Sequence, residues 1–349
     1  MSGEAKPSTL EAARASLMRS AALKPFEYLV WLPLPLLIFL FPSKAFLLNE
    51  IAILALFAVS LDLILGFAGI VSLGHAAFFG AGAYTAGILA ANGFGAPLLG
   101  LAAGGAAAAL LGFATSFFIL RGSDLTRLMI TLGLQLILLE LANRFSGLTG
   151  GTDGLYGMTV DPIAGLFSFD LTGQTAWFYS LTVLFAAFLF ARRLVHSPFG
   201  RSLKAVKGNR RRAAFLGIDT NRRLVAIYTV SAGLAGLAGV LLAQTTQFVS
   251  LDVLDFHRSA EVLLVLVIGG TGYLYGGIFG AVIFKLMQDW LSGMTPQYWQ
   301  FWIGLLLVAI VLVGRERMTG GLGRLAAFLP GRPARRAAKA PAAGGEDAP

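Results

Sequence analysis

The sequence predicts an all-α fold, a polytopic bundle of transmembrane helices with about ten membrane segments, some of them broken or re-entrant. Hydrophobic residues make up 56% of the 349 residues and charged residues only 13%, whereas soluble domains carry about 25% charged residues. Apolar runs of about 18 residues or more recur through most of the chain. The 43 glycines would weaken helices in water, but they let helices approach closely in lipid. The bilayer is therefore the expected solvent of this chain.

A series of apolar segments defines the expected transmembrane domain, residues 26–314. Pro33 and Pro35 are expected to break the first segment, because proline lacks an amide donor and clashes inside a helix. Glycines are frequent from Gly66 to Gly95, so this part is expected to be an interrupted or closely packed helix, poorly suited to face lipid. The segments are residues 26–42, 46–66, 69–91, 96–120, 125–146, 176–191, 224–247, 260–289 and 299–314.

Lys and Arg outnumber Asp and Glu by 27 to 18. The excess lies in loops and tails, so it indicates the cytosolic bias of membrane-protein loops and no nucleic-acid partner. Three basic stretches are expected in the cytosol: the leader 1–25, the loop 192–223 and the tail 315–349, whose composition also predicts disorder. The leader shows no small-residue cleavage site and is expected to be retained. Both termini are then cytosolic, and Arg121 and Arg127 mark a smaller cytosolic loop.

The positions of the basic loop and the basic tail constrain the number of crossings between them. Segment 224–247 leaves the cytosol. If residues 260–289 crossed only once, segment 299–314 would deliver the tail to the outside, against the charge rule. Residues 260–289 are therefore expected to cross twice or to re-enter. The break is expected between Gly269 and Gly277, because a glycine cluster releases a helix at low steric cost.

The polar stretch from Ser146 to Ala176 is expected on the outer side of the membrane. It is rich in Gly and Thr, notably from Leu148 to Leu155. Exposed loops are the parts of a membrane protein that a soluble partner can reach. This stretch is therefore the expected surface for an external partner.

Several kinds of chemistry find no support in the sequence. There is no Cys and His occurs only three times, at His75, His196 and His257, so disulfides and metal sites are not expected. The phosphate-binding motif G-x-x-x-x-G-K-[ST] is absent, so any ATP must be bound by another chain. Gly270-Thr271-Gly272 lies in an apolar segment and lacks the strand and the acid of a dinucleotide site. The chain is expected to use no cofactor and to have no catalytic residues.

The most distinctive local pattern lies in the basic loop, from Ser197 to Asp219. The Pro198-Phe199-Gly200 entry and the Gly217 stop predict a short basic helix between them. Its apolar residues predict an amphipathic helix that lies across the cytosolic face, where it can dock in a groove of another protein. A positive-inside loop without a partner remains the alternative. The apolar residues are Leu203, Val206, Ala213, Ala214 and Leu216.

This loop resembles the coupling loop of bacterial ABC importer permeases, in which a short Ala-Ala-x-x-x-Gly-like helix inserts into a cleft of the ATPase subunit. The match is Ala213-Ala214-Phe215-Leu216-Gly217. More narrowly, the stretch from Gly66 to Thr85 looks like the signature of LivM-type branched-chain amino acid permeases. Residues 148–155, and Glu261 followed by residues 267–272, match as well. Members often carry a Glu where Arg210 begins a wholly basic run, which affects the electrostatics of docking.

The resemblance implies a permease subunit of an ATP-driven importer, which passes branched-chain amino acids delivered by an external or periplasmic substrate-binding protein. The other implied partners are ATP-binding cassette subunits, a second, LivH-like permease subunit and the lipid of a bacterial inner membrane. Residues of the implied ATPase coupling loop are Pro198, Phe199, Gly200, Arg201, Ala213, Ala214, Leu216 and Gly217.

The glycine-rich segments supply candidates for a translocation path. His75 either lines such a path or is a neutral histidine that bonds a backbone carbonyl of the irregular helix. The nearby aromatic residues can line an apolar cavity for Leu, Ile or Val, or can simply pack. The candidates are Ser72, His75, Phe78, Phe79, Tyr84, Gly269, Gly270, Thr271 and Gly272.

One other function class and a different cargo remain open. Broken helices and intramembrane charges also suit an ion-coupled secondary transporter, although the chain shows no convincing internal repeat. The same importer class can instead carry urea, amides or other amino acids. The ionisable residues in or near the spans are Asp62, Glu140, Glu261, Lys285 and Asp289.

Overall fold

The computed structural model describes residues 31–163, 165, 167–169, 172–298, 300–302, 304, 305 and 308. Residues up to Trp290 belong to one compact unit, and those from Leu291 onward belong to a second. Within the described residues every regular element is a helix, as the sequence predicts. The elements are η1 (Leu34–Leu36), α3 (Leu37–Leu40), η2 (Pro42–Lys44), α4 (Ala45–Asp62), η3 (Leu63–Ala68), α5 (Ala76–Ala91), α6 (Pro97–Ile119), α7 (Asp124–Arg144), α8 (Ser146–Thr149), η4 (Gly151–Asp153), α9 (Gln174–His196), α10 (Pro198–Gly208), α11 (Arg210–Phe215), α12 (Thr220–Thr246), η5 (Leu251–Leu254), α13 (Phe256–Gly269) and α14 (Leu274–Met294).

The predicted leader 1–25, most of segment 299–314 and the predicted tail 315–349 lie outside the described residues. The first apolar segment is described from Trp31 onward. There the helix is broken into the short elements η1, α3 and η2, and Pro33 directly precedes η1. The break predicted from the prolines of this segment is therefore confirmed.

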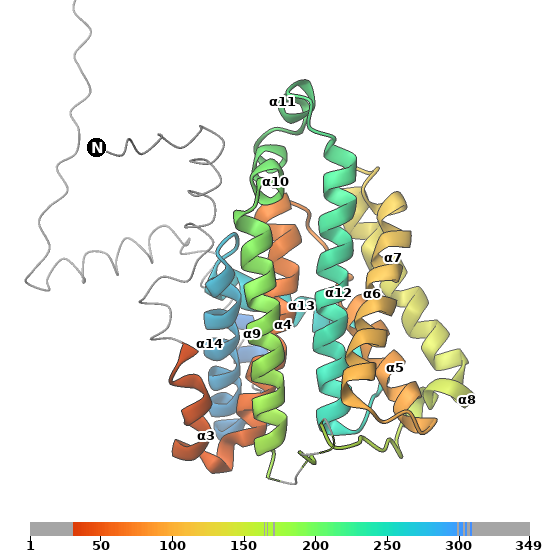
Figure 1. Ribbon diagram of the computed structural model, residues 1–349, viewed down its shortest axis with the longest axis vertical. Helices are drawn as coiled ribbons and strands as arrows, with labels where there is room; N and C mark the ends of the chain where they lie inside the picture. The colour runs from red at the N-terminus through yellow and green to blue at the C-terminus, as the bar shows by residue number, and fades with distance from the viewer. Residues whose placement is uncertain are drawn as a thin grey trace, which may run out of the picture. The chain divides into compact units, whose positions relative to one another are not determined.

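Helix α4 is the most enclosed apolar helix of the first unit. The continuous helical stretch Pro42–Ala68 has the highest mean hydropathy of the candidate spans, and 94% of its most apolar window is buried. The corresponding buried shares are only 22% in α6 and 17% in α7. A helix that is apolar all round and buried belongs inside a bundle. Helices α9 and α12 flank α4 (Figure 1), whereas α6 and α7 present large apolar side chains outward.

Glycines bring α5, α6 and α12 into close contact. A Cβ atom at Gly82 would collide with the backbone of Gly236, and one at Gly239 would collide with the carbonyl of Phe79. A Cβ at Gly104 would strike the side chain of Val240. Small residues permit this approach, and dispersion contacts between the backbones stabilise it. The close packing predicted for the glycine-rich segment is confirmed.

The chain leaves helical geometry between α4 and α5. The α4 helix widens into the π-helical turn η3, which ends at Gly69 with a φ of 73°. Residues 69–75 form an irregular loop, and α5 begins only at Ala76. Hydrogen bonds from two other helices hold this loop: Thr131 Oγ1 accepts from the Leu73 amide at 3.3 Å, and Ser259 Oγ accepts from the Ala76 amide at 2.9 Å. The interruption predicted for the stretch from Gly66 to Gly95 is confirmed.

The long apolar segment near the C-terminus consists of two helices. Helices α13 and α14 meet at an angle of 110°, and the link between them falls within the predicted glycine cluster. At one end of α4, Lys44 pairs with Asp289 of α14 at 2.7 Å. Beyond the other end, Gly66 lies against Gly272, just before α14 begins. Helices α4 and α14 are therefore antiparallel.

Five described helices are long and apolar enough to cross a membrane, or six if α13 and α14 form one broken span. The apolar α5 has only 16 residues, and the first and last predicted segments are incompletely described. These helices make the chain a multi-pass membrane protein. The total of about ten segments and the double crossing or re-entry by α13 and α14 stay predictions.

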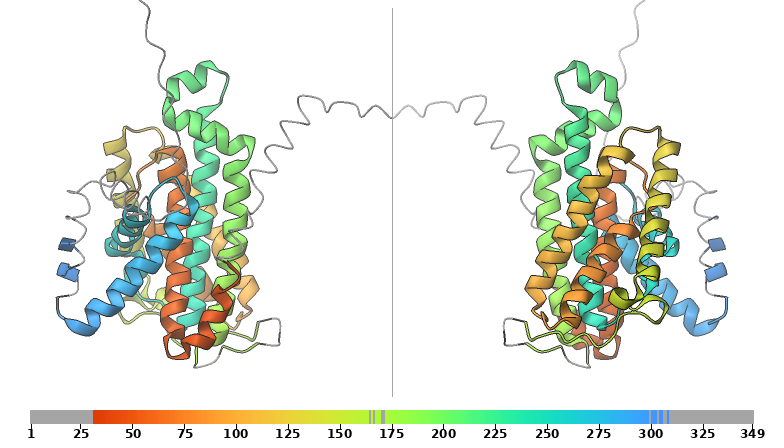
Figure 2. Two further views of the ribbon diagram at one scale, coloured as in Figure 1. Left: turned by 90° about the vertical axis from the view of Figure 1, so that its left-hand side faces the viewer. Right: turned by 90° about the vertical axis from the view of Figure 1, so that its right-hand side faces the viewer.

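The two ends of the first unit differ in character. The basic helices α10 and α11 lie at the upper end in Figure 1, and α8 lies toward the lower end. Figure 2 shows the same separation from two sides. Near the lower end, Leu155 and Val249 exchange backbone hydrogen bonds at 2.7 and 3.1 Å, which ties the polar loop after α8 to the loop after α12.

Candidate functional site

The basic loop folds as a helical hairpin between α9 and α12, called here the α10–α11 hairpin (Pro198–Gly217). Ser197 caps α10 by accepting the amide of Gly200, with Pro198 in the first turn. Asn209 has an extended backbone, and its side chain caps α11 by accepting the amide of Arg212 at 2.9 Å. Gly217, with a φ of 80°, ends the hairpin, as expected for a left-handed glycine after a helix.

The structure corrects the prediction of a single short helix over this loop. The cap at Asn209 divides it into α10 and α11 because an extended residue cannot continue the helix. The expected apolar face is divided as well. Leu203, Val206 and Ala213 are buried, but Leu216 is 74% exposed, and Ala214 is exposed too.

The tip of the hairpin presents apolar side chains to its surroundings. Phe215 is 91% exposed beside the exposed Leu216. Arg211 and Arg212, one turn earlier, are also exposed. Adjacent exposed apolar residues rimmed by charge are typical of a surface that contacts another protein.

The remaining residues predicted for coupling lie at the base of the hairpin. The Arg223 guanidinium lies 5.3 Å from the ring centre of Phe199. A Cβ at Gly200 would collide with the Val195 carbonyl, so this glycine permits the tight turn from α9 into α10. Arg201 is exposed. The hairpin is thus anchored at its base and exposed at its tip.

A set of four residues, the Gly66 junction, connects the hairpin to the broken helices. Lys207 Nζ of α10 donates to the carbonyl oxygen of Gly66 at 2.5 Å. Asp62 Oδ1 accepts the amide of Gly272 at 2.7 Å. A Cβ at Gly66 would collide with both Asp62 and Gly272. The junction is therefore the point at which the α10–α11 hairpin, the π-helical turn η3 and the α13–α14 link meet.

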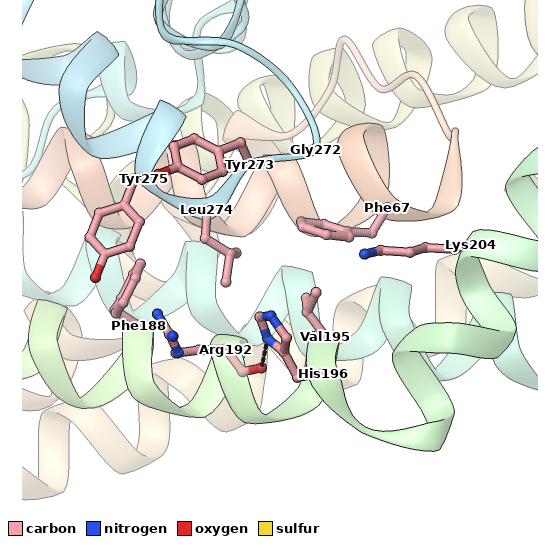
Figure 3. A pocket seen from close by; sticks show the side chains of 10 residues that line it. All are labelled: Phe67, Phe188, Arg192, Val195, His196, Lys204, Gly272, Tyr273, Leu274 and Tyr275. Atoms are coloured by element: carbon pink, nitrogen blue, oxygen red, sulfur yellow. Dashed lines mark hydrogen bonds between the residues drawn. The ribbon is translucent and has the colours of Figure 1, made fainter. Parts of the chain in front are cut away.

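A cavity of about 370 Å³ adjoins this junction (Figure 3). Three of its lining residues are basic: Arg192 and His196 on α9, and Lys204 on α10. Lys204 Nζ lies 5.5 Å from the ring centre of Phe67. The lining residues are Phe67, Phe188, Arg192, Val195, His196, Lys204, Gly272, Tyr273, Leu274 and Tyr275.

The structure gathers some of the predicted path residues around His75. The His75 Nε2 atom lies 3.0 Å from Ser60 Oγ. His75 is therefore hydrogen-bonded to a side-chain hydroxyl, and not to a backbone carbonyl as the second of the two predictions for this residue had it. The His75 ring stacks on Phe57 at 5.5 Å between centroids and meets the edge of Phe78 at 5.6 Å. Ser231 Oγ also donates to the Ser60 carbonyl at 2.6 Å, which links α12 to this cluster.

The other predicted path residues are dispersed. Ser72 and Tyr84 are buried, and neither they nor His75 and Phe78 line the cavity beside the junction or a second cavity of about 250 Å³. Gly272 lines the cavity beside the junction, and Phe79 lines the second one. Gly269, Gly270 and Thr271 form the bend between α13 and α14.

Sequence reasoning missed the role of two residues in the junction. Asp62 is completely buried, and its position in an apolar segment was a signal, since ionisable groups there need polar partners. Lys207 gave no signal, because it stands among many basic residues of one loop.

Together, these features define a multi-pass helical membrane protein in which an exposed basic hairpin is fixed to the break points of buried helices. The family described as "Branched-chain amino acid transport system / permease component" matches residues 44–311. The chain belongs to this family.

The chain is similar to curated permease proteins of bacterial transport systems. It is 28% identical over 280 residues to the high-affinity branched-chain amino acid transport system permease protein LivM of Escherichia coli, covering 73% of this chain and 64% of LivM. It is 27% identical over 160 residues to LivH of the same organism, covering 45% of this chain and 50% of LivH. It is 28% identical over 160 residues to the fructose import permease protein FruG of Bifidobacterium longum, covering 44% of this chain and 46% of FruG.

The chain spans less than two thirds of the length of the LivM protein that it matches. No solved structure matches it significantly.

Proposed function

We propose that this chain is a permease subunit of an ATP-driven importer, and that it passes branched-chain amino acids delivered by an external binding protein. The observation that carries the proposal is the α10–α11 hairpin. Its tip exposes Phe215 and Leu216, and its base is hydrogen-bonded through Lys207 to Gly66 at the end of the central helix. A partner that moves the tip therefore acts directly on the broken helices.

The transport cycle follows from this connection. ATP binding draws the ATPase subunits together and displaces the hairpin. The Gly66 junction passes the displacement to the α13–α14 link and to the loop 69–75. Both are breaks between helices, so the adjoining helices can rotate slightly there without unfolding. The translocation path then closes to one side of the membrane and opens to the other. ATP supplies the direction, since the protein states differ in their affinity for the nucleotide-bound partner.

The proposal assigns a partner to each surface. ATP-binding cassette subunits, which hydrolyse the ATP, occupy the hairpin end, and the substrate-binding protein occupies the end with the polar loop 146–173. A second, LivH-like permease subunit and membrane lipid cover the apolar sides. The basic hairpin then faces the cytosol of a bacterial cell, with both termini on that side of the inner membrane.

Branched-chain amino acids are the proposed cargo because the LivM relative is named for their transport and matches over 73% of this chain. The fructose permease FruG matches less of it, 44%, but it shows that similar permeases serve other substrates. Urea, amides and other amino acids are the alternatives.

Reconstitution tests the proposal. The chain, its partner permease, the ATPase subunits and the binding protein are placed in proteoliposomes and supplied with labelled leucine, valine, urea or fructose. We expect ATP-dependent uptake of leucine and valine only when all components are present. ATP-driven uptake of urea or fructose alone would refute the cargo. Leucine uptake driven by an ion gradient without ATP would refute the importer class.

A further inference from the structure

A second cavity, of about 250 Å³, lies toward the opposite end of α4 from the Gly66 junction. Helices α4, α5, α12, α13 and α14 all contribute to it. Apolar side chains line part of it, and charged or amide side chains, called here the charged wall, line the rest. The apolar lining residues are Ile53, Leu54, Phe57, Phe79 and Leu242, and the polar ones are Glu50, Arg258, Glu261, Lys285 and Gln288.

The charged wall is an alternating network. Lys285 Nζ lies 3.2 Å from Glu50 Oε2 and 3.5 Å from Glu261 Oε1. Arg258 pairs with the other oxygen of Glu261 at 3.1 Å. The side chains of Glu261 and Lys285 are only 6% and 10% exposed. Buried charges are costly unless they are paired, so this wall is a built feature of the fold.

One polar atom of the wall lacks a partner. Within the described residues, Gln288 Oε1 is buried and accepts no hydrogen bond. An unsatisfied buried acceptor destabilises a protein unless something donates to it. Gln288 also lines the cavity, so this acceptor lies beside the space that a ligand with N–H groups would occupy.

The charge balance of the lining residues selects the kind of ligand. Among the lining residues, Arg258 and Lys285 supply two positive charges, and Glu50 and Glu261 supply two negative ones. Asp252, which does not line the cavity, also pairs with Arg258 at 2.7 Å. An anion or a cation would unbalance this set in a poorly solvated place, whereas a zwitterion leaves the balance unchanged. The apolar lining residues accommodate an aliphatic side chain. The volume, somewhat below the 300–1,000 Å³ typical of sites for larger ligands, suits a small molecule.

We propose that this cavity binds an aliphatic α-amino acid as its zwitterion. The carboxylate faces Arg258 and Lys285, and the ammonium group faces Glu50, Glu261 and Gln288 Oε1. The side chain of the amino acid packs among Phe57, Phe79 and Leu242. These residues give the permease an amino acid site of its own, separate from that of the binding protein.

The position of the cavity agrees with this role. Glu50 is six residues after Lys44, about 9 Å along α4, and the exposed pair Lys44–Asp289 marks that end of the helix. This end is opposite the α10–α11 hairpin. The inference rests on the proposed function, under which this end faces the external binding protein, so the cavity is the first site that a delivered amino acid reaches.

Photolabelling tests the site directly. The assembled importer, in nanodiscs and without its binding protein, is irradiated with a diazirine analogue of leucine, and the labelled peptides are mapped by mass spectrometry. We expect label on the stretches that contain Phe57, Phe79 or Leu242. Excess leucine should abolish it. Excess 4-methylpentanoate or isoamylamine, which each lack one of the two charges, should not.

Transport by variants supplies a second readout. In the full proteoliposome assay, Lys285→Met is expected to reduce leucine uptake about tenfold or more, the effect of losing a charge-assisted hydrogen bond. Phe79→Trp, which reduces the space without removing charge, is expected to reduce uptake as well. Lys44→Met is the matched control, since it removes a lysine from an exposed ion pair outside the cavity, and it should transport like the wild type.

The outcomes separate the two proposals. If the wild-type importer takes up leucine but the label maps elsewhere, or if Lys285→Met and Phe79→Trp both transport normally, the cavity is not an amino acid site and the proposed function stands. If the wild-type importer takes up no branched-chain amino acid, the proposed function fails, and the inference fails with it. If Lys285→Met does not assemble, the labelling and Phe79→Trp decide.

Discussion

Lys207 of α10 donates a hydrogen bond to the carbonyl oxygen of Gly66 at 2.5 Å, across 141 positions of sequence. The acceptor lies in the π-turn that ends the central helix, where a widened helix leaves carbonyls free to bond elsewhere. On the other side of Gly66 lies the amide of Gly272, held by Asp62. One lysine thus links the exposed hairpin to two helix breaks.

Replacing Lys207 with methionine should separate ATP hydrolysis from transport. Met keeps an apolar stem of similar length but cannot donate to Gly66, so the hairpin would move without moving the break. We expect leucine uptake per ATP hydrolysed to fall about tenfold, in line with the loss of a hydrogen bond from a charged donor. Both rates are measured in proteoliposomes.

Arg193→Met is the control for this change, because Arg193 is an exposed basic residue in the last turn of α9, at the same end of the protein. It should retain the wild-type ratio. A normal ratio in Lys207→Met would show that the hydrogen bond does not transmit motion.

Gly66→Ala should destabilise the protein, because the new methyl group would collide with Asp62 and the backbone of Gly272. Overpacking of this kind costs about 1–3 kcal/mol. The expected result is a lower thermal unfolding midpoint for the purified permease complex, measured by intrinsic fluorescence.

Gly133→Ala provides the comparison, since no described atom lies within 4 Å of the position where its Cβ would stand on α7. This variant should be as stable as the wild type or more stable, because alanine favours a helix. If Gly66→Ala and the wild type had equal thermal unfolding midpoints, the close packing at the Gly66 junction would be contradicted.

The tip of the hairpin should decide ATPase association. Phe215→Asp places a charge on a residue that is 91% exposed, so folding should be unaffected while burial against a partner becomes costly. We expect co-purification of the ATPase subunits with the permease to be lost. Gly217→Val, or a bulky residue at the buried Ala213, should have the same effect by distorting α11, and a bulky residue at the exposed Ala214 should obstruct the contact itself.

Tyr156→Asp serves as a control at the opposite end, where Tyr156 is 70% exposed, and it should leave ATPase association intact. If the ATPase subunits co-purify normally with Phe215→Asp and with Gly217→Val, the hairpin is not their docking element.

Membrane topology can be measured by cysteine labelling, because the chain has no native cysteine. Single variants Arg211→Cys, Tyr156→Cys and Gln297→Cys are treated with a membrane-impermeant maleimide in intact and in permeabilised spheroplasts. We expect Tyr156→Cys and Gln297→Cys to react in intact spheroplasts, and Arg211→Cys to react only after permeabilisation. Gln297→Cys lies after α14 and reports whether α13 and α14 return the chain to the outer side, as they do if they cross twice or re-enter.

Protection of Gln297→Cys in intact spheroplasts would mean that α13 and α14 together cross once. Reaction of Arg211→Cys there would place the hairpin outside and remove the proposed position of the ATPase subunits.

The sequence determined those properties that depend on neighbouring residues. Long apolar runs require helices, because an unpaired backbone is costly in lipid. Glycines and prolines predicted where helices break, as at Pro33 and in the Gly269–Gly277 cluster, since backbone freedom is local. The Gly217 stop of the basic loop was predicted for the same reason. The division at Asn209 was not, because a run of basic residues and alanines is compatible with one continuous helix.

The tertiary structure decided which distant residues meet. Lys207 is one basic residue among many until the fold places it on Gly66, and Lys285 is an isolated charge until α4 and α13 bring Glu50 and Glu261 to it. Hydropathy does not encode such pairings, because a side chain's partner depends on how whole helices pack. The sequence by itself therefore determined a helical membrane protein with a basic hairpin and broken spans. Only the packing of its helices decided that the hairpin is joined to Gly66 and that paired charges line a cavity together with apolar side chains.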